Sequence, residues 1–190
     1  VGGGPIPPAL LDRAAGAGVP AVTTYGLTEA CSQVTTGGPA LFCTRVRIDD
    51  SGQILVAGPT VAPAAAAADG WLHTGDLGEL DATGVLSVTG RTADTIVTGG
   101  ENVAPAEVEA VLAAHPAVAE AGVYGIADPE WGERVAARIV LRPGARATVE
   151  ELGEHCRVRL AGYKVPKMFK FSSDLPKTKS GKLSRRSMEG

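Results

Sequence analysis

The sequence predicts an α/β segment followed by a small α+β domain, and three observations support this fold class. Over residues 1–23, a glycine-rich loop, a helical pattern and a short apolar run follow one another, which is the order expected of an α/β layer. Two weakly alternating runs then carry hairpin turn signals at residues 49–52 and 81–84. Beyond residue 94, helical and strand patterns alternate within one compact block.

The first part of the chain is expected to hold one helix, one short strand and a small β subdomain. Pro7 and Pro8 suit a helix start, because a missing N–H costs nothing in the first helical turn. We expect this helix to reach Gly16 and residues 19–23 to form a short buried strand. Residues 37–90 predict the β subdomain.

The pattern breaks at residues 91–94, where we place a hinge at Asp94 between two domains, residues 1–91 and 92–190. The second domain is predicted to be α+β. Its strand over residues 135–141 alternates with period two and is expected to be half buried. The elements predicted here are helices beginning at Pro105 and at a capping box on residues 148–151, and strands over residues 118–126, 135–141 and 167–171.

Composition narrows the class of protein. The chain has 190 residues, 44% of them apolar, and a net charge of −3, so no bulk attraction to nucleic acid is expected. No apolar run approaches the roughly 20 residues that span a bilayer, and no membrane insertion is predicted. Cys31, Cys43 and Cys156 fit neither a disulfide framework nor a zinc site, which predicts reduced thiols and a cytoplasmic protein.

Two loops in the first part of the chain carry polar or flexible residues suited to a nucleotide. Residues 2–5 read Gly-Gly-Gly-Pro, and such glycines let a backbone approach a flat ring or a phosphate, although a simple turn has the same composition. Residues 25–29 read Tyr-Gly-Leu-Thr-Glu, and their hydroxyl and carboxylate are hard oxygen ligands that suit Mg²⁺ held with nucleotide phosphates. The alternative is a tyrosine in the core and a glutamate in solvent.

The Tyr-Gly-Leu-Thr-Glu segment resembles a core motif of the adenylate-forming superfamily, which includes acyl-CoA synthetases, firefly luciferase and peptide-synthetase adenylation domains. Three further motifs resemble those of the same superfamily and follow in the same order. They are His-Thr-Gly-Asp at residues 73–76, the hinge region at residues 90–109, and Pro-Lys-Thr-Lys-Ser-Gly-Lys at residues 176–182. Together the motifs span nearly the whole chain.

The resemblance implies the end of a large N-terminal domain, comprising part of an α/β layer and the β subdomain, followed by a small mobile C-terminal α+β domain. It assigns Asp76 to the ribose of ATP, since one carboxylate can accept from two adjacent hydroxyls. Glu29 is assigned to Mg²⁺. The other residues that it assigns to ATP or AMP are Gly3, Gly4, Pro5, Tyr25, Gly26, Thr28 and Arg91.

The acid substrate is predicted from residues 23–33, which resemble most the superfamily members that ligate o-succinylbenzoate to coenzyme A in menaquinone synthesis. Thr24 stands where many relatives carry a glycine, and it would narrow the acid pocket and offer a hydrogen bond. Ser32 is assigned the same role, and Leu27 is placed beside the acid. A dicarboxylate needs such polar contacts, because buried polar groups are paired. The alternative is that these residues serve the local structure.

The reaction implied by the resemblance has two steps and uses ATP, Mg²⁺ and coenzyme A. A carboxylate attacks the α-phosphorus of ATP, and a coenzyme A thiol then attacks the acyl-adenylate. Lys182 is the predicted catalytic residue of the first step. Rotation about Asp94 would then bring Gly99 and Gly100 to the coenzyme A side. Lys177, Lys179 and Arg185 are expected to be solvated, and a homo-oligomer is left open.

Two rival functions come from other classes. A peptide-synthetase adenylation domain would pass its acyl group to a carrier protein. A non-catalytic nucleotide-binding fragment is favoured by the absence of the superfamily's phosphate loop from these residues. We therefore expect the 190 residues alone to bind ATP poorly and not to turn over.

Overall fold

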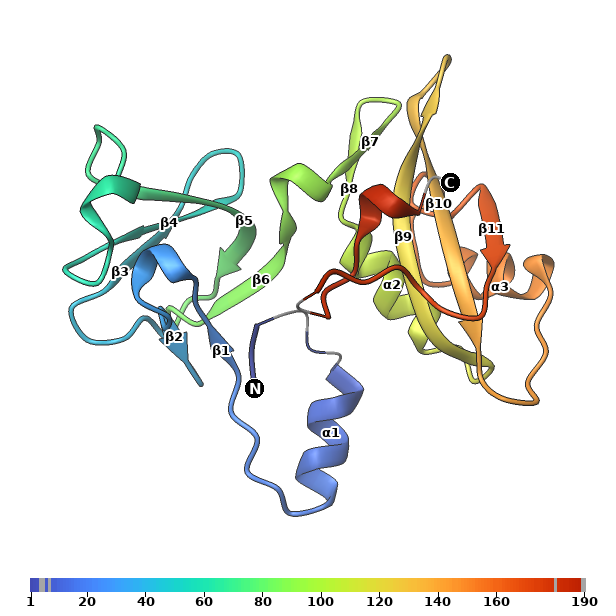
Figure 1. Ribbon diagram of the computed structural model, residues 1–190, viewed down its shortest axis with the longest axis horizontal. Helices are drawn as coiled ribbons and strands as arrows, with labels where there is room; N and C mark the ends of the chain where they lie inside the picture. Colours follow the sequence, from blue (N-terminus) through green and yellow to red (C-terminus); the bar gives the residue numbers. More distant parts are fainter. Residues whose placement is uncertain (4–5, 7, 180, 189–190) are drawn as a thin grey trace. The chain divides into compact units, whose positions relative to one another are not determined.

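The computed structural model describes residues 1–3, 6, 8–179 and 181–188. The chain forms two compact units, here called unit 1 (Val1–Ala93) and unit 2 (Asp94–Gly190). Each unit has its own β-sheet (Figure 1). The predicted fold class is confirmed, because both units resemble solved structures of the same type.

Unit 1 is built on an antiparallel sheet of order β3-β4-β5-β6. Both predicted hairpins are present. At each turn an aspartate accepts backbone N–H groups: Asp49 Oδ1 from Ser51 and Gln53, and Asp81 Oδ1 from Thr83 and Val85. The strands are β3 (Arg45–Ile48), β4 (Gln53–Ala57), β5 (Leu72–Leu80) and β6 (Leu86–Arg91).

Short elements complete unit 1 and close its core. Ala30 and Val34, from the segment after the first strand, are fully buried against Ile54 and Val56 of β4. This packing holds the segment of residues 25–34 against the sheet. The short elements are α1 (Pro8–Gly16), β1 (Thr24–Tyr25), η1 (Thr28–Ala30), β2 (Thr35–Thr36) and η2 (Pro63–Ala65).

The prediction of a buried strand over residues 19–23 is wrong. Val19 is 55% exposed and Val22 is 47% exposed, and neither lies in a strand. The strand is restricted to residues 24–25, where β2 supplies the pairing partner. A strand needs a neighbour for its backbone N–H and C=O groups, and the register of β1 with β2 covers only these two residues.

Unit 2 contains a sheet of order β11-β10-β7-β8, with β9 also paired to β10. Strands β10 and β11 run parallel, and the other pairs are antiparallel. The predicted helices and strands are present, and a hairpin that the sequence analysis missed joins β7 to β8. The elements are η3 (Thr92–Asp94), which precedes the sheet, β7 (Ile96–Thr98), β8 (Glu101–Val103), α2 (Pro105–Ala113), β9 (Val118–Asp128), β10 (Gly132–Leu141), α3 (Val149–Arg157), β11 (Met168–Phe171) and η4 (Arg185–Ser187).

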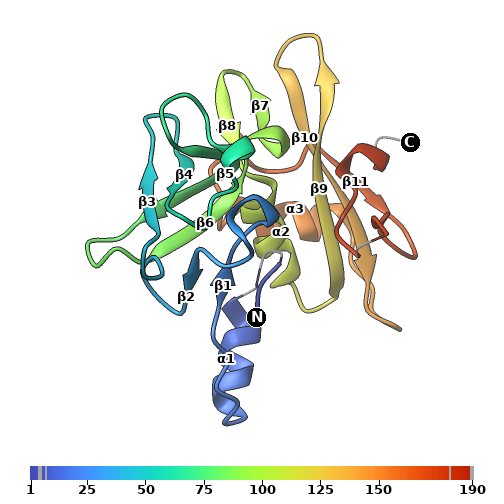
Figure 2. The same cartoon turned by 60° about the vertical axis from the view of Figure 1, so that its left-hand side comes forward.

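Helices α2 and α3 cover one face of the sheet of unit 2 (Figures 1 and 2). The buried side chains Val108 and Leu112 of α2 and Leu152 of α3 pack against Val123 and Ile139 of the sheet. The predicted capping box is confirmed: the Thr148 hydroxyl accepts from the Glu151 N–H, and the Glu151 carboxylate accepts from the Thr148 N–H. Such a cap satisfies two backbone donors that the helix leaves unpaired.

The opposite face of β9 and β10 is covered by the C-terminal segment. Met188 is fully buried against Tyr124 of β9 and Ala136 of β10, and Leu183 packs on the same cluster. The prediction that residues 135–141 form a half-buried strand is therefore wrong at Ala136, which is fully buried. The alternation of side chains is real, but a segment distant in sequence covers the second face.

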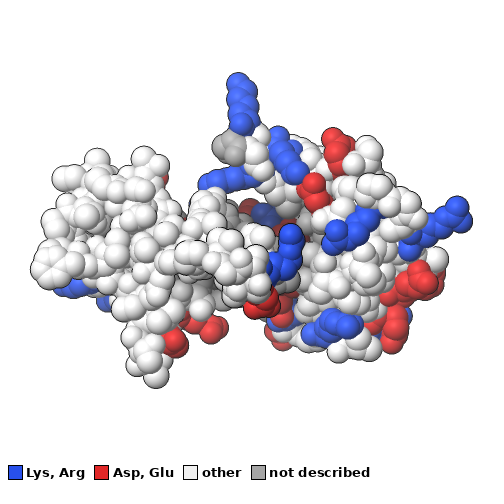
Figure 3. Space-filling model, turned by 90° about the horizontal axis from the view of Figure 1, so that it is seen from below, with Lys and Arg blue, Asp and Glu red and all other residues white. Residues whose placement is uncertain are grey.

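The surface of unit 2 carries both signs of charge. On the face seen in Figure 3, Lys and Arg side chains are interspersed with Asp and Glu on the right-hand part, which is unit 2. This mixture agrees with the small net charge of −3. Within the described residues, no helix has the length and hydrophobicity needed to cross a bilayer.

Candidate active site

Asp76 is the centre of a polar cluster in unit 1. The β5–β6 register places it opposite Arg91, and Asp76 Oδ1 lies 2.7 Å from Arg91 Nε. Asp76 Oδ2 accepts a hydrogen bond of 2.9 Å from the Tyr25 hydroxyl. Because an ionised carboxylate has about four acceptor positions, these two contacts leave it able to accept from a ligand. The structure thus brings together three residues that the sequence assigned to one nucleotide.

The orientation of Asp76 is supported by Thr74, which the predicted site did not include. The Thr74 hydroxyl donates to the Ile54 carbonyl oxygen at 2.8 Å and accepts from the Asp76 N–H at 3.1 Å. Its place in the His-Thr-Gly-Asp motif was the available signal. Burial, and more weakly the negative charge of Asp76, raise the pKa of the Tyr25 phenol well above its usual value, so this hydroxyl remains a donor.

Gly26 has a steric role in the loop that follows Tyr25. A Cβ atom at Gly26 would lie 1.4 Å from the Ser32 carbonyl oxygen. The loop is closed by hydrogen bonds from the Ser32 N–H to the Leu27 carbonyl oxygen and from the Val34 N–H to the Tyr25 carbonyl oxygen. Leu27 packs against the core of unit 1, whereas Ser32 is exposed and adopts a left-handed backbone conformation with φ 88°.

Glu29 and Thr28 lie in the 3₁₀ turn η1, and both are exposed. The Glu29 carbonyl oxygen accepts from the Ala62 N–H at 2.8 Å, which anchors the turn. No group of three or more potential metal-ligating side chains occurs among the described residues. A single carboxylate nevertheless fits Mg²⁺, which retains waters and is commonly held by one or two carboxylates together with substrate phosphates.

The N-terminal glycines lie close to β1. A Cβ atom at Gly2 would lie 2.6 Å from the Thr24 carbonyl oxygen, and the Thr24 N–H donates to the Val1 carbonyl oxygen at 2.8 Å. Gly3 has φ +87°, a conformation that favours glycine. Gly4 and Pro5, which were also assigned to the nucleotide, lie outside the described residues.

Lys182 in unit 2 lies near the end of a segment here called the lysine loop (residues 177–183, of which Ser180 lies outside the described residues). Its base is an isolated antiparallel bridge between Lys177 and Leu183. The Thr178 N–H donates to the Lys182 carbonyl oxygen at 2.7 Å, and the Lys182 N–H donates to the Thr178 hydroxyl at 3.2 Å. Lys182 is exposed, so its ammonium group is presented on a held backbone.

Gly99 and Gly100 form the two-residue turn of the β7–β8 hairpin. Both have positive φ, +58° and +84°, as a turn with two left-handed residues requires. A Cβ atom at Gly99 would lie 2.7 Å from the Trp131 ring, whereas nothing lies within 4 Å of the corresponding position at Gly100. A side chain at Gly100 would therefore project from the turn.

The prediction that Arg185 is solvated is wrong. Its guanidinium Nη1 lies 2.9 Å from Asp94 Oδ2, and Nη2 lies 2.9 Å from both carboxylate oxygens of Glu109. Arg185 Nε also donates to the Val123 carbonyl oxygen at 3.2 Å. By contrast, Lys177 makes a surface pair with Glu120, in which both side chains are about half exposed. The sequence shows both residues only as cations and does not indicate that one is paired inside the unit and the other at its surface.

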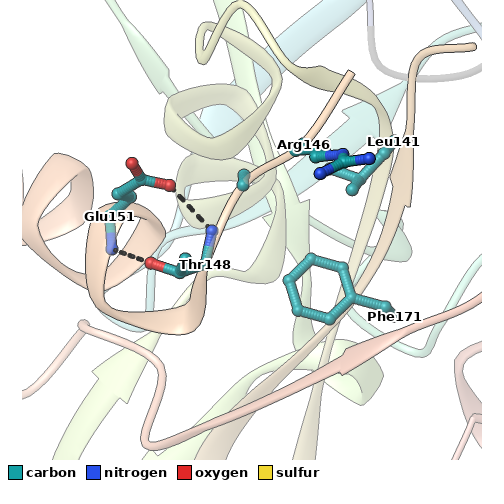
Figure 4. Close-up of a pocket in the computed structure, with 6 residues that line it drawn as sticks. Leu141, Arg146, Thr148, Glu151 and Phe171 are labelled. Carbon is teal, nitrogen blue, oxygen red and sulfur yellow. Dashed lines mark hydrogen bonds between the residues drawn. The ribbon is translucent and has the colours of Figure 1, made fainter. Parts of the chain in front are cut away.

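The hollow shown in Figure 4 lies elsewhere in unit 2. It has a volume of about 540 Å³, and its polar wall includes the hydrogen-bonded capping pair Thr148 and Glu151. The side chains of that pair are occupied by the helix cap, and the predicted site residues do not line the hollow. The other residues of its lining are Leu141, Arg146, Ala147 and Phe171.

Comparison with known protein families identifies the class. Residues 107–182 match the family model described as the AMP-binding enzyme C-terminal domain. This match covers α2, β9, β10, α3, β11 and the lysine loop up to Lys182. The resemblance to adenylate-forming enzymes that the motifs predicted is confirmed.

Several of the most similar relatives are named as ligases of o-succinylbenzoate, and other similar solved structures are an amide bond synthetase and chimeras of MatB. A 2-succinylbenzoate–CoA ligase from Geobacillus sp. (strain WCH70) is 41% identical over 100% of this chain, which corresponds to 44% of that protein. A structure of o-succinylbenzoate CoA synthetase (MenE) from Bacillus subtilis with the acyl-adenylate intermediate OSB-AMP has a TM-score of 0.90 and 40% identity, and covers 100% of this chain and 45% of that one.

A second structure of the Bacillus subtilis enzyme, in complex with ATP and magnesium ion, has a TM-score of 0.89 and 39% identity over 100% of this chain and 45% of that one. The present chain therefore spans less than half the length of these relatives.

Proposed function

We propose that the protein containing this chain is an ATP-dependent, AMP-forming ligase that converts o-succinylbenzoate to its coenzyme A thioester. The nucleotide part of the proposal is carried by Asp76, whose buried carboxylate is oriented by Tyr25 and Arg91 and retains acceptor capacity. The acid is inferred from the relatives, which are named as ligases of this substrate. Their names also favour a coenzyme A thioester over transfer to a carrier protein.

In the proposed first step, the carboxylate of the acid forms a bond to the α-phosphorus of ATP, and the bond to pyrophosphate breaks. Two anions must approach each other, so a cation at the reacting atoms lowers the barrier. Lys182 supplies this cation from the lysine loop. Mg²⁺, bound with the phosphates and Glu29, would offset the charge of the departing pyrophosphate.

In the proposed second step, the sulfur of coenzyme A forms a bond to the acyl carbon, and AMP leaves with the electron pair of the broken C–O bond. The Gly99-Gly100 turn is assigned to this step, since its free side at Gly100 leaves room for a slim pantetheine arm. Asp94 is proposed as the hinge between the two steps. Thr24, Leu27 and Ser32 are proposed to contact the acid.

The decisive experiment measures acid-dependent pyrophosphate release by the full-length protein, with o-succinylbenzoate, benzoate and a fatty acid compared at equal concentration. We expect release and thioester formation to be strongest with o-succinylbenzoate. Lys182→Ala should lower the rate of release by about 10²–10³, whereas Lys179→Ala on the same loop should change it little. Equal rates with all three acids would reject the substrate, and equal effects of the two substitutions would reject the role of Lys182.

The role of Gly100 is tested by separating the half-reactions. Because a side chain at Gly100 would project from the turn, Gly100→Leu should slow thioester formation more than pyrophosphate release. Gly144→Leu is the matched control, since Gly144 also has positive φ and open space around it but lies before α3. Equal losses in both half-reactions would contradict this assignment.

A further inference from the structure

Arg185 connects three parts of unit 2 that are distant in sequence. Its Nη1 contacts Asp94 at the start of the unit, its Nη2 contacts Glu109 on α2, and its Nε donates to the Val123 carbonyl oxygen on β9. All three guanidinium nitrogens are therefore engaged within the protein. Only 19% of the Arg185 side chain is exposed, so this is an internal junction and not a surface contact.

The two carboxylates of this junction are held differently. Glu109 contacts Arg185 through both oxygens, accepts from the Val123 N–H at 2.9 Å, and is 15% exposed. Asp94 contacts Arg185 through one oxygen and is 34% exposed. Both oxygens of Glu109 contact the same nitrogen, Nη2, and Glu109 is the more buried of the two carboxylates. The more exposed Asp94 makes a single contact, which solvent screens more, so this contact is the weaker of the two.

The lysine loop ends directly before this junction. Leu183 closes the base of the loop, the Ser184 N–H donates to the Pro176 carbonyl oxygen at 2.8 Å, and Arg185 is the next residue. The backbone between Lys182 and Arg185 is therefore short and hydrogen-bonded. Because Asp94, Glu109 and the Val123 carbonyl oxygen hold the guanidinium group, the Arg185 side chain anchors the backbone at the base of the loop.

A second anchor of the same segment does not involve Asp94. Leu183 and Met188 pack on Tyr124 and Ala136, and Arg138 Nη2 donates to the Met188 carbonyl oxygen at 2.6 Å. This apolar anchor holds the segment on the sheet when the contact between Asp94 and Arg185 is lost. Loss of that contact is thus expected to alter the position of the loop without unfolding the segment.

From this arrangement we infer that Arg185 is a positioning residue that ties the lysine loop to Asp94, so that the state of the Asp94 carboxylate contact sets how firmly Lys182 is held. The inference rests on the proposed function of Lys182 and extends it. Arginine is required because its planar fork reaches two carboxylates at once, which a lysine ammonium group at the same position does not reproduce. This connection predicts that substitutions of Asp94 and Arg185 have non-additive effects on the rate of the proposed first step.

The test uses the full-length protein with Asp94→Asn, Arg185→Lys and the double variant. Each single substitution should lower the rate of acid-dependent pyrophosphate release by about tenfold, and the double variant should be no slower than the slower single variant. The rate of thioester formation from preformed acyl-adenylate should fall less. Arg157→Lys is the matched control, because Arg157 pairs with Glu154 on the exposed face of α3 and should change either rate by less than about twofold.

A second readout does not depend on turnover. The amides of Thr178, Gly181 and Lys182 are hydrogen-bonded within the lysine loop, so hydrogen exchange in a peptide covering the loop reports its order. Asp94→Asn should speed this exchange severalfold, although Asp94 is more than eighty positions away in the sequence, and Arg157→Lys should leave it unchanged.

Unchanged exchange in Asp94→Asn, or additive losses of rate in the double variant, would overturn the role of Arg185. A wild-type protein without acid-dependent pyrophosphate release would instead overturn the proposed function, and the exchange measurement would still decide whether Asp94 and the lysine loop are tied. The two failures are therefore distinguishable.

Discussion

Two clusters of this chain pair an arginine with carboxylates, one around Asp76 in unit 1 and one around Arg185 in unit 2, but a different partner is buried in each. In unit 1, the carboxylate of Asp76 is buried at 6% exposure, and its partner Arg91 is largely open, with 61% of its side chain exposed. In unit 2, the arginine is the enclosed member, and Arg185 meets two carboxylates. The first cluster leaves the carboxylate of Asp76 able to accept from a ligand, whereas in the second all three guanidinium nitrogens of Arg185 contact the protein.

This difference separates a binding site from a structural junction. Asp76 uses two of its acceptor positions in its contacts with Tyr25 and Arg91 and can still accept hydrogen bonds from hydroxyl groups. Arg185 uses all three of its nitrogens, so few of its N–H donors remain for a ligand. Substitutions in unit 1 should therefore affect ligand binding more than folding. Substitutions in the Arg185 cluster should affect the free energy of unfolding, and they should affect the proposed first step through the lysine loop.

The largest effect on stability is expected from Glu109→Ala. It leaves Arg185 enclosed with only one carboxylate, and removing one partner of a buried ion pair costs about 3 kcal/mol. Urea unfolding of this chain, followed by circular dichroism, measures the loss. The control is Glu154→Ala, which breaks an exposed pair with Arg157 and should cost less than about 1 kcal/mol. Equal losses would show that the Arg185 junction is no more structural than a surface pair.

A loss of similar size, but in ligand binding, is expected from Asp76→Ala. Hydrogen bonds to a charged group contribute about 1.5–3 kcal/mol, so the affinity of the full-length protein for AMP should fall about 10²-fold. Isothermal titration with AMP measures this change. Asp81→Ala, in a turn of the same sheet, serves as the control. If both variants bind AMP equally well, Asp76 is not the nucleotide ligand. The Asp76 cluster is then a structural ion pair, as the Arg185 junction is.

A smaller effect is expected from Tyr25→Phe, which removes one hydrogen bond to Asp76 and keeps the ring. The free energy of unfolding of this chain should fall by about 1 kcal/mol. The affinity of the full-length protein for AMP should fall less than in Asp76→Ala, because the carboxylate remains. A loss of affinity as large as that of Asp76→Ala would indicate that Tyr25 contacts the nucleotide itself.

The smallest effect concerns His155, a basic group of unit 2 whose hydrogen-bond partner is a backbone carbonyl oxygen and not a carboxylate. Its Nε2 lies 2.9 Å from the Val111 carbonyl oxygen. Burial lowers the pKa of His155 below its usual 6.5, and the nearby positive charge of Arg159 acts in the same direction. Because the folded state then binds fewer protons than the unfolded state, stability should fall as the pH drops below about 6.5.

This pH dependence is measured by urea unfolding of the chain between pH 5.5 and pH 7.5. In His155→Gln, the loss of stability over this range should be smaller than in the wild type. The exposed His73 provides the comparison, and His73→Gln should retain the wild-type dependence on His155. A pH dependence that survives in His155→Gln would assign it to another group.

Sequence reasoning located the two hairpins of the unit 1 sheet, the capping box and the motifs that surround Asp76, because each is encoded within a few residues. Turn aspartates and glycines have local physical causes, and so does a capping threonine. Sequence-based predictions of burial and strand pairing were wrong where a residue distant in sequence decides them. Ala136 is buried by Met188, and residues 19–23 are not a strand because the register of β1 with β2 covers only residues 24–25.

What the sequence determined by itself is the fold class, the order of the motifs and the superfamily, since these depend on residue types at short spacing. What only the tertiary structure decided is how the charged residues are used. Lys177 and Arg185 are both cations of one terminal segment, yet one lies at the surface and the other joins Asp94 to Glu109. Whether a charge is buried and paired depends on which distant carboxylates the fold brings close to it. The residues next to it in the sequence do not indicate these partners.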